Sequence, residues 1–392
     1  MTLTIDKAAL AAKGLEALRR GDAATARGTF EQIVAAGQAD VSTHVAIAFA
    51  CRDLGDATGA QASLDRALAL DPRNVQALIV KGDFLAGAGD ARAAASFYRA
   101  AVRAAPPLEN LPKDFRAEIE RAAAQVARYA SQFESHLERF LQAKGFDGGP
   151  SRPRFRESLE LLFGRKEIYF QRPRYYYFPG LPQNQFYERE RFPWLDAVEA
   201  ATADIRAELL EVLRDESAFK PYVEAGANRP RNEQMGMLGN PAWSAFYLWK
   251  NGERVDANAA RCPKTMRALE HVPLTRVQNR SPSVLFSLLR PGAHIPPHNG
   301  VVNTRLICHL PLVVPGQCTF RVGNEIREWV EGKAWVFDDT IEHEAWNRSS
   351  QTRVILLFET WKPELSEEER ALVCTMFEAI DAHSGEKPEW EI

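Results

Sequence analysis

Apolar residues in the first part of the chain recur at helical spacing, and the helical pattern itself repeats. A Gly-Asp pair marks each repeat, at residues 21, 55 and 89, which gives a constant interval of 34 residues. Other positions keep the same register: Ala26, Ala60 and Ala94, then Phe30, Leu64 and Tyr98. Each repeat therefore predicts two helices, with the Gly-Asp turn between them and a small residue where they cross.

An interval of this length is typical of tetratricopeptide repeats, whose helical hairpins stack into a solenoid. We therefore predict an α-helical solenoid of such repeats over residues 1–110. Plain alanine-rich hairpins are the alternative, but they would not require a fixed interval. Solenoids present a concave surface, so we expect the array to dock a protein or peptide, which could be the substrate.

After Pro106 and Pro107, apolar spacing predicts one long helix over residues 113–144, followed by a Gly/Pro-rich boundary. The chain is thus expected to contain three segments: repeats at 1–110, a helical linker or cap at 111–150, and a further domain at 151–392. Within the last segment we expect helices at 196–214, 263–269 and 363–380, and a strand at 243–249.

The second half of the chain changes to short β-rich runs separated by turn dipeptides. Turn signals lie at Pro291-Gly292, Pro315-Gly316 and Gly323-Asn324. The runs cover residues 283–289, 304–312, 318–322, 334–337 and 352–359. Strands of this length and spacing favour an antiparallel sandwich or barrel. The predicted fold class is therefore α+β and multidomain, with a helical solenoid followed by a β-domain and its flanking helices.

Charge and composition narrow the function. Lys and Arg number 49 and Asp and Glu 52, a net charge of −3, so we expect no nucleic-acid partner. The sequence contains no run of eighteen apolar residues and no apolar stretch behind a basic start, so we expect neither a membrane span nor a signal peptide. The five cysteines form no CxxC pair, which favours free thiols in a reducing cytoplasm.

Four of the eight histidines fall within the β-rich region: His294, His298, His309 and His343. His298 follows Pro296-Pro297 and His343 follows the run at 334–337, so both are expected at strand ends. Imidazole binds Fe, Cu, Zn and Ni, and an open site in a β-barrel favours non-haem iron. The usual iron site has a carboxylate two residues after the first histidine, where this chain has Gly300. Either two protein ligands suffice, or a nearby acid such as Asp339 serves.

The runs PGAHIPPHNG, NTRLICHL and EGKAWVFDDTIEHEAWN, together with Arg353, resemble the aspartyl/asparaginyl β-hydroxylase family, as do RPRYYYFPGLP and RERFPWLD upstream. The resemblance covers about residues 169–365. It implies a double-stranded β-helix (a cupin-like jelly roll) that uses Fe(II), 2-oxoglutarate and O2. Members of this family lack the usual carboxylate ligand, in agreement with Gly300.

The resemblance also assigns roles to residues. It implies that His298 and His343 bind the iron, and that Arg353 pairs with the distal carboxylate of 2-oxoglutarate, with His309 and Ser287 beside it. A planar guanidinium suits such a bidentate contact. The better-known members carry a second arginine where this chain has Ile307, and Arg305 remains as a substrate contact. Asp339 either orients a water on the metal or forms a turn.

We predict a 2-oxoglutarate-dependent dioxygenase that hydroxylates the β-carbon of an Asp/Asn-like residue or a related acidic substrate, forming succinate and CO2. One alternative is hydroxylation of a lipid acyl chain, as in a related branch of the family. A second alternative is a non-catalytic interaction protein in which only the repeats act. The joint presence of His298, His343, His309 and Arg353 argues against this last interpretation.

Overall fold

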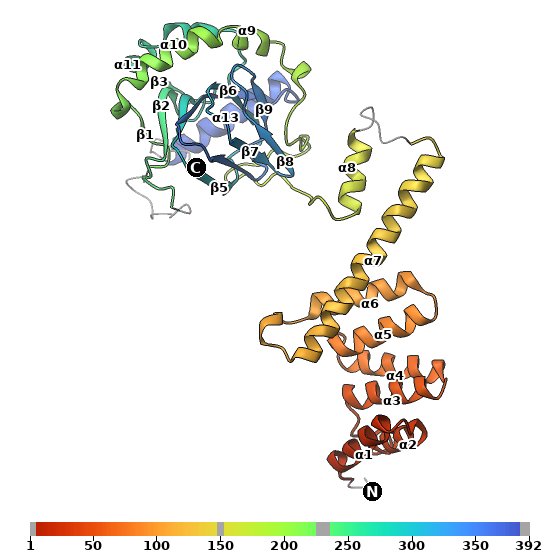
Figure 1. Cartoon of the computed structure of the whole chain (residues 1–392). Coiled ribbons are helices and arrows are strands. Elements are labelled where there is room, and N and C mark those ends of the chain that lie inside the picture. The colour runs from red at the N-terminus through yellow and green to blue at the C-terminus, as the bar shows by residue number, and fades with distance from the viewer. Residues whose placement is uncertain (1–4, 147–152, 225–235, 385–392) are drawn as a thin grey trace. The chain divides into compact units, whose positions relative to one another are not determined.

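The computed structural model describes residues 5–146, 153–224 and 236–384. The chain divides into two compact units, Met1–Phe163 and Gly164–Ile392, which are described separately (Figure 1). The boundary expected between residues 150 and 151 falls outside the described residues.

The first unit is built from helical hairpins. Its helices are α1 (Lys7–Arg19), α2 (Ala23–Ala35), α3 (Val41–Asp53), α4 (Ala57–Leu70), α5 (Val75–Gly87), α6 (Ala91–Ala104), the short 3-10 turn η1 (Leu108–Asn110), α7 (Lys113–Ala143) and α8 (Pro153–Leu162). Figure 1 shows the six helices α1–α6 stacked one after another. The predicted helical repeats are therefore confirmed.

The repeating residues explain why each hairpin forms. Gly21, Gly55 and Gly89 adopt φ values of 76°, 76° and 85°, a left-handed conformation that glycine enters without steric cost. The aspartate that follows each glycine caps the next helix, because its side chain accepts a hydrogen bond from a first-turn backbone N–H. Ala26, Ala60 and Ala94 are fully buried where the helices of each pair cross.

Helix α7 continues the stack and then extends beyond it. Ile119 and Ala122 are buried against the last repeat, and the Tyr129 ring stacks on Tyr98 with a centroid separation of 6.4 Å. Arg121 adds a two-pronged ion pair with Asp83 of α5. The first half of α7 thus covers the apolar face that α6 would otherwise expose.

The second unit is a sandwich of two antiparallel sheets. One sheet has the order β1-β2-β4-β11-β6-β9, with β3 attached to β2, and the other has the order β5-β10-β7-β8. The strands are β1 (Lys220–Pro221), β2 (Trp243–Lys250), β3 (Glu253–Arg254), β4 (Val284–Leu289), β5 (His294–His298), β6 (Arg305–Val313), β7 (Cys318–Val322), β8 (Glu325–Glu328), β9 (Trp335–Phe337), β10 (His343–Asn347) and β11 (Arg353–Trp361).

Strands β4 to β11 alternate between the two sheets, except that β7 and β8 form a hairpin within the smaller sheet, and this is the order of a double-stranded β-helix. The five predicted runs correspond to β4, β6, β7, β9 and β11, and the predicted strand at 243–249 is β2. The sequence did not predict β5 and β10, the two strands that carry His298 and His343. Two prolines in β5, and the absence of β-branched residues from β10 (HEAWN), conceal their β-character.

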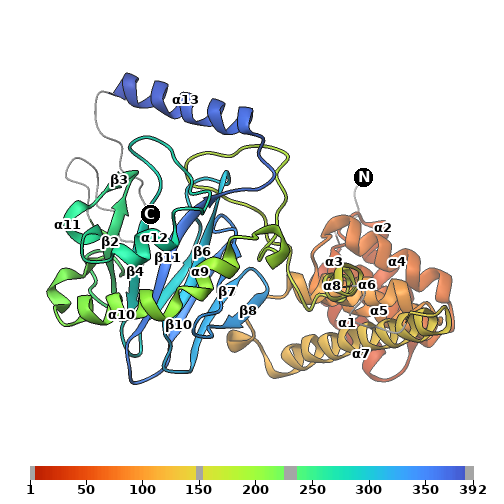
Figure 2. The ribbon, with the colours of Figure 1, turned by 90° about the horizontal axis from the view of Figure 1, so that it is seen from above.

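Helices cover the outer face of the larger sheet. They are α9 (Leu195–Ala200), α10 (Thr202–Leu213), α11 (Asp256–Ala259) and α12 (Pro263–Ala268). Figure 2 shows α9 and α10 lying across the strands, and Val198, Ile205 and Leu209 are completely buried there. The single helix expected at 196–214 was wrong in one respect: it breaks at Ala201, where the Thr202 hydroxyl donates back to the Glu199 carbonyl.

The last described element, α13 (Glu367–Ser384), begins with a capping box. The Ser366 hydroxyl accepts from the Glu369 backbone N–H, and the Glu369 carboxylate accepts from the Ser366 N–H. The helix predicted at 363–380 is therefore confirmed, with later bounds. Within the described ranges, no helix is both long enough and apolar enough to cross a membrane.

Candidate active site

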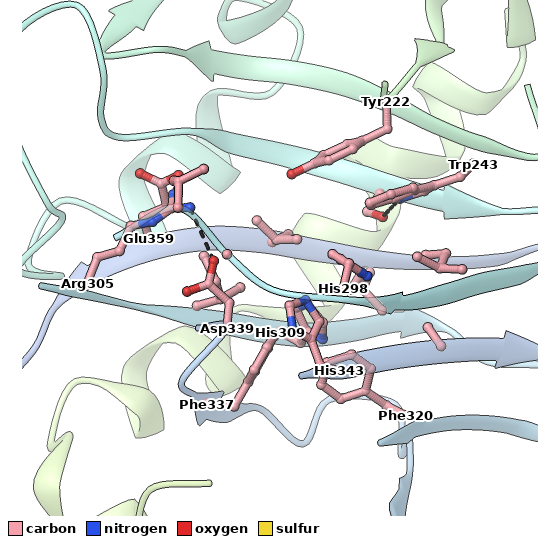
Figure 3. A pocket seen from close by; sticks show the side chains of 18 of the residues that line it. Tyr222, Trp243, His298, Arg305, His309, Phe320, Phe337, Asp339, His343 and Glu359 are labelled. Carbon is pink, nitrogen blue, oxygen red and sulfur yellow. Dashed lines mark hydrogen bonds and ion pairs between the residues drawn. The ribbon is translucent and has the colours of Figure 1, made fainter. Parts of the chain in front are cut away.

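One pocket opens between the two sheets, and all seven residues to which the sequence assigned a role line it (Figure 3). These are Ser287, His298, Arg305, His309, Asp339, His343 and Arg353. They come from strands β4, β5, β6, β10 and β11 and from the loop between β9 and β10. The fold therefore gathers into one site residues that lie up to 66 positions apart in the sequence.

The two predicted metal ligands are cross-strand neighbours. His298 ends β5 and His343 begins β10, and the two residues are directly paired in the antiparallel register. Their ring centroids are 4.1 Å apart. Side chains of directly opposed residues lie on the same face of a sheet, so both rings enter the pocket together.

Hydrogen bonds fix the tautomer of both rings. His298 Nδ1 lies 2.8 Å from the Pro296 carbonyl oxygen, and His343 Nδ1 lies 3.0 Å from the Ile341 carbonyl oxygen. A carbonyl oxygen can only accept, so each Nδ1 carries the proton and each Nε2 keeps a lone pair. Burial lowers the pKa of His298 to about 4 and that of His343 well below its usual value. Both are therefore neutral imidazoles, the form that binds metal ions.

The carboxylate of Asp339 stands close to the backbone of Gly300. A Cβ atom added to Gly300 would lie 2.1 Å from Asp339 Oδ2, far inside contact distance. A side chain at position 300 and the present position of Asp339 therefore exclude one another. In the part of the chain that the structure describes, no three His, Cys, Asp or Glu residues are grouped as a metal site. The choice between two histidine ligands and a triad completed by Asp339 stays a prediction.

One end of the pocket holds a buried cation. Arg353 is 1% exposed, and its guanidinium stacks over the Trp329 ring at 4.6 Å from the ring centre. Its Nη1 donates to the Ser287 carbonyl oxygen at 3.3 Å, and its Nε has no partner among the described residues. None of these residues forms an ion pair with Arg353, and burial lowers its pKa to about 10. A buried guanidinium without a counter-ion among the described residues is suited to bind an anion.

His309 and Trp243 complete this end of the pocket. His309 is 5% exposed, and its Nδ1 has no partner among the described residues. Burial and the nearby Arg353 charge hold the pKa of His309 well below its usual value, so the ring is neutral. The Trp243 indole N–H donates to the Ser287 hydroxyl at 3.2 Å. An anion held by Arg353 would thus meet neutral hydrogen-bonding groups.

The opposite end carries a second arginine in a different setting. Arg305 is 5% exposed and forms ion pairs with both Glu359 and Asp339. The two carboxylates are equally enclosed, at 3% and 5% exposed. Burial raises the pKa of Asp339 to about 6, although Arg305 opposes that shift. Figure 3 shows this group on one side of the pocket, with the histidine pair toward the other side.

A buried network holds the loop that joins Asp339 to His343. Asp338 and Lys362 are both fully buried and form an ion pair of 2.6 Å. The same Asp338 oxygen accepts from Gln171 Nε2 at 2.6 Å, and Gln171 in turn accepts from Asn303. The other Asp338 oxygen accepts from the Thr340 backbone and hydroxyl. Three segments outside the loop, those that carry Gln171, Asn303 and Lys362, therefore hold it at the start of β10.

The sequence missed several residues that line the pocket: Arg174, Tyr222, Trp243, Trp329 and Glu359. Glu359 carried a usable signal, because it is the one acid within the otherwise uncharged run VILLFETW of β11. A charge in the middle of a fully buried strand requires a partner. Tyr222 and Arg174 lie in irregular segments, where no periodicity could have assigned them to the site.

Residues 199–363 match the family described as aspartyl/asparaginyl beta-hydroxylase. The second unit therefore contains a region that is similar to aspartyl/asparaginyl β-hydroxylases. This similarity agrees with the strand order, the histidine pair and the glycine at position 300. The matched region begins after the arm that supplies Arg174 and Gln171, so part of the pocket and of its support lies outside the matched residues.

Curated relatives are also similar to part of this chain. The chain is 35% identical over 182 residues to the aspartyl/asparaginyl beta-hydroxylase of Homo sapiens, and the aligned region covers 45% of this chain and 24% of that protein. It is 35% identical over 181 residues to the ornithine lipid ester-linked acyl 2-hydroxylase of Rhizobium tropici, and the aligned region covers 45% of this chain and 60% of that protein. The chain thus spans less than two thirds of the length of these relatives.

Solved structures resemble the repeat unit. One is the type III secretion chaperone SycD of Yersinia enterocolitica with a peptide of the translocator YopD, at 13% identity and a TM-score of 0.31, covering 34% of this chain and 98% of that chain. Another is the Sgt2 TPR domain from Aspergillus fumigatus, at 18% identity and a TM-score of 0.27, covering 32% and 81%.

Proposed function

We propose that this protein is an Fe(II)- and 2-oxoglutarate-dependent dioxygenase that hydroxylates the β-carbon of an Asp- or Asn-like residue or of a related acidic substrate, in a peptide or a small molecule. In such a reaction O2 supplies one oxygen atom to the substrate C–H bond and one to 2-oxoglutarate, which becomes succinate and CO2. Iron and 2-oxoglutarate supply the oxidising chemistry when bound, and the residues of the pocket bind and orient the reactants.

Arg353 carries this proposal. It is a fully buried cation with no anionic partner among the described residues, and it shares one pocket with two neutral imidazoles. A site that required only a metal would have no use for an unpaired buried guanidinium, which is costly to bury. A dicarboxylate that spans from the metal to Arg353 explains both features together.

The residues present fit the absent groups. His298 and His343 would hold the metal through their Nε2 atoms, whose lone pairs are free because each Nδ1–H donates to a carbonyl. Arg353 would receive the distal carboxylate with two parallel N–H donors. Ser287, whose hydroxyl accepts from Trp243, and the neutral ring of His309 would lie beside the bound dicarboxylate.

The test measures iron binding, 2-oxoglutarate binding and succinate formation on the same full-length protein. We expect one iron per chain, and succinate formed only when iron, 2-oxoglutarate and O2 are all supplied. Arg353→Met should leave the iron stoichiometry unchanged while weakening 2-oxoglutarate binding. Normal succinate output from Arg353→Met would overturn the assignment. A protein that binds neither iron nor 2-oxoglutarate would instead support the non-catalytic interpretation.

Hydroxylation of a lipid acyl chain is the second candidate function. It is supported by the apolar wall of the pocket, which includes Ile295, Ile307, Ile355 and Leu357, and by the similarity to the Rhizobium tropici acyl hydroxylase. An acyl chain needs apolar contact along its length and no charged partner at the reacting carbon. Stimulation of succinate formation by an acyl ester, and not by peptides, would favour this function.

We infer that the repeat unit docks a protein or peptide, in keeping with the concave surface that stacked helical hairpins present. Binding energy gained far from the reacting carbon lowers KM for a docked substrate. A chain beginning at Gly164 should therefore keep its affinity for iron and 2-oxoglutarate but lose kcat/KM on the physiological protein substrate. Equal kcat/KM for both proteins would remove the repeats from substrate recognition.

A further inference from the structure

The two buried arginines of the pocket differ in charge balance, and this difference bears on the substrate. Arg353 has no ionic partner among the described residues, whereas Arg305 has two, Glu359 and Asp339. The group of three at the Arg305 end therefore contains one more carboxylate than guanidinium. All three side chains are more than nine-tenths buried, so water screens their charges little.

The neighbouring lining positions add no second buried cation at this end. Ile307 is the direct cross-strand partner of Glu359 in the β6–β11 pair, so both side chains lie on the same face of the sheet. It is buried and lines the pocket, but it offers only apolar contact. Arg174 also lines the pocket, and its charge opposes the rise in the pKa of Asp339, but its side chain is exposed and solvent screens its charge more than that of Arg305. A carboxylate entering this end would thus meet two buried carboxylates, one guanidinium that both already engage, and the screened charge of Arg174.

Each member of the group also keeps one polar atom without a hydrogen-bond partner in the described part of the chain. These atoms are Asp339 Oδ1, Glu359 Oε2 and Arg305 Nε, that is, two acceptors and one donor. Unpaired buried polar atoms destabilise a protein unless a ligand satisfies them. A carboxamide offers two N–H donors and one carbonyl acceptor, which is the complementary set. A carboxylate offers only acceptors, and an acyl chain offers neither donors nor acceptors.

We propose that this end of the pocket selects a carboxamide, the side-chain group of asparagine, over a carboxylate or an acyl chain. The proposal rests on the hydroxylase function proposed above and narrows it to one substrate class. Glu359 and Asp339 are the residues that determine the selectivity, because they neutralise Arg305 and accept from the substrate N–H groups. Tyr222 lies at the same end, with its hydroxyl directed toward this group in Figure 3.

The experiment uses the full-length protein with iron, 2-oxoglutarate and two peptide libraries that differ only at one central residue, asparagine or aspartate. Product is counted by mass spectrometry as peptide heavier by one oxygen atom, and succinate is measured in parallel. We expect at least about tenfold more hydroxylated product from the asparagine library, since repulsion between buried like charges disfavours aspartate. Equal products, more product from aspartate, or hydroxylation of neither library overturns the carboxamide assignment.

Variants separate a charge effect from a structural one. Glu359→Gln keeps the shape and removes one negative charge, so the asparagine-to-aspartate product ratio should fall at least about fivefold. Asp339→Asn is the second variant, in case Glu359→Gln does not fold, and should change the ratio in the same direction. A purely structural role would lower both products together and leave the ratio unchanged, which would overturn the role assigned to these acids.

Failure of the selectivity and failure of the proposed function give different results. If no succinate forms under any condition and iron does not bind, the dioxygenase function is wrong, and the carboxamide assignment is overturned with it. If succinate forms and only an acyl ester or the aspartate library is hydroxylated, the dioxygenase function stands and the carboxamide assignment is wrong.

Discussion

The two units of this protein use sequence in opposite ways. In the repeat unit the same few residues return at a fixed interval: a glycine in the left-handed conformation, a capping aspartate and a buried alanine at each crossing. In the second unit the residues of the pocket do not recur along the chain, and they meet because strands that are distant in the sequence pair. We therefore expect substitution of one repeated residue to lower stability only modestly, whereas substitution of a pocket residue removes its role in the site.

The distribution of tryptophan makes this contrast measurable. All eight tryptophans lie at or after Trp194, in the second unit. Tryptophan fluorescence therefore follows unfolding of the second unit alone, while far-ultraviolet circular dichroism is weighted toward the helices of the repeats. Each substitution below can thus be assigned to the unit that it destabilises.

The largest expected effect is loss of metal binding on removal of either pocket histidine. His298→Ala or His343→Ala deletes one of two protein ligands, so we expect iron stoichiometry close to zero and no succinate. His294→Ala is the matched control, because His294 lies at the other end of β5 and pairs with Glu344 instead of lining the pocket. Retention of full iron stoichiometry in either variant would contradict the assignment of ligands.

The second prediction compares the two arginines. Arg305→Met leaves two buried carboxylates without a cation, so we expect the free energy of unfolding to fall by about 3–5 kcal/mol. Arg353→Met removes a cation that has no ionic partner among the described residues, so stability should change little, while 2-oxoglutarate affinity falls by about a hundredfold or more. Denaturation followed by fluorescence and titration with 2-oxoglutarate measure the two effects. Equal losses of stability in the two variants would contradict the difference in ion pairing between Arg305 and Arg353.

The third prediction compares one glycine from each unit and expects opposite signs. Gly300→Ala places a Cβ atom against the Asp339 carboxylate and should lower stability by about 1–3 kcal/mol. Gly28→Ala lies on the exposed face of α2, where an added Cβ has no neighbour within 4 Å, and should raise stability by about 0.5–1 kcal/mol. Loss of stability in both would mean that Gly28 has a role beyond its helix.

The smallest expected effect concerns a repeated cap. Asp90→Ala removes the side chain that accepts from the Ala93 N–H, so we expect the repeat unit to lose about 1 kcal/mol. Asp90→Asn keeps an acceptor and should be nearly neutral. Circular dichroism should report the change and tryptophan fluorescence should not. A fluorescence change in Asp90→Ala would show that the two units unfold together.

Sequence predicted most where structure is local or periodic. The repeats, the long helix at 113–144 and five of the eight strands of the β-helix follow from spacing, turn residues and propensity. The histidine pair could be named because the motif around each residue is distinctive. Its geometry could not, since the pairing of His298 with His343 depends on two strands, β5 and β10, that the pattern did not predict.

The ion pairs within the pocket could not be predicted from the sequence, again because they join residues that are distant along the chain. Arg305 and Glu359 are 54 positions apart, and no local signal states that they meet. Asp339 was predicted near the metal, but its contact with Arg305 required the fold. Arg305 was expected to contact substrate; the structure places it in the pocket, paired with two acids that the sequence could not assign to it, and the substrate contact stays a prediction.

The hydrogen-bond chain from Asp338 through Gln171 to Asn303 has a consequence for how this domain is delimited. Gln171 lies 28 residues before residue 199, where the family match begins. Its side chain is nevertheless buried and donates to Asp338. A fragment cut at residue 199 would leave that acid with one fewer donor and the Asn303 amide with one fewer acceptor. The residues that match the family model therefore leave out part of the buried support of the site, and a fragment intended to keep that site must include the arm that carries Gln171.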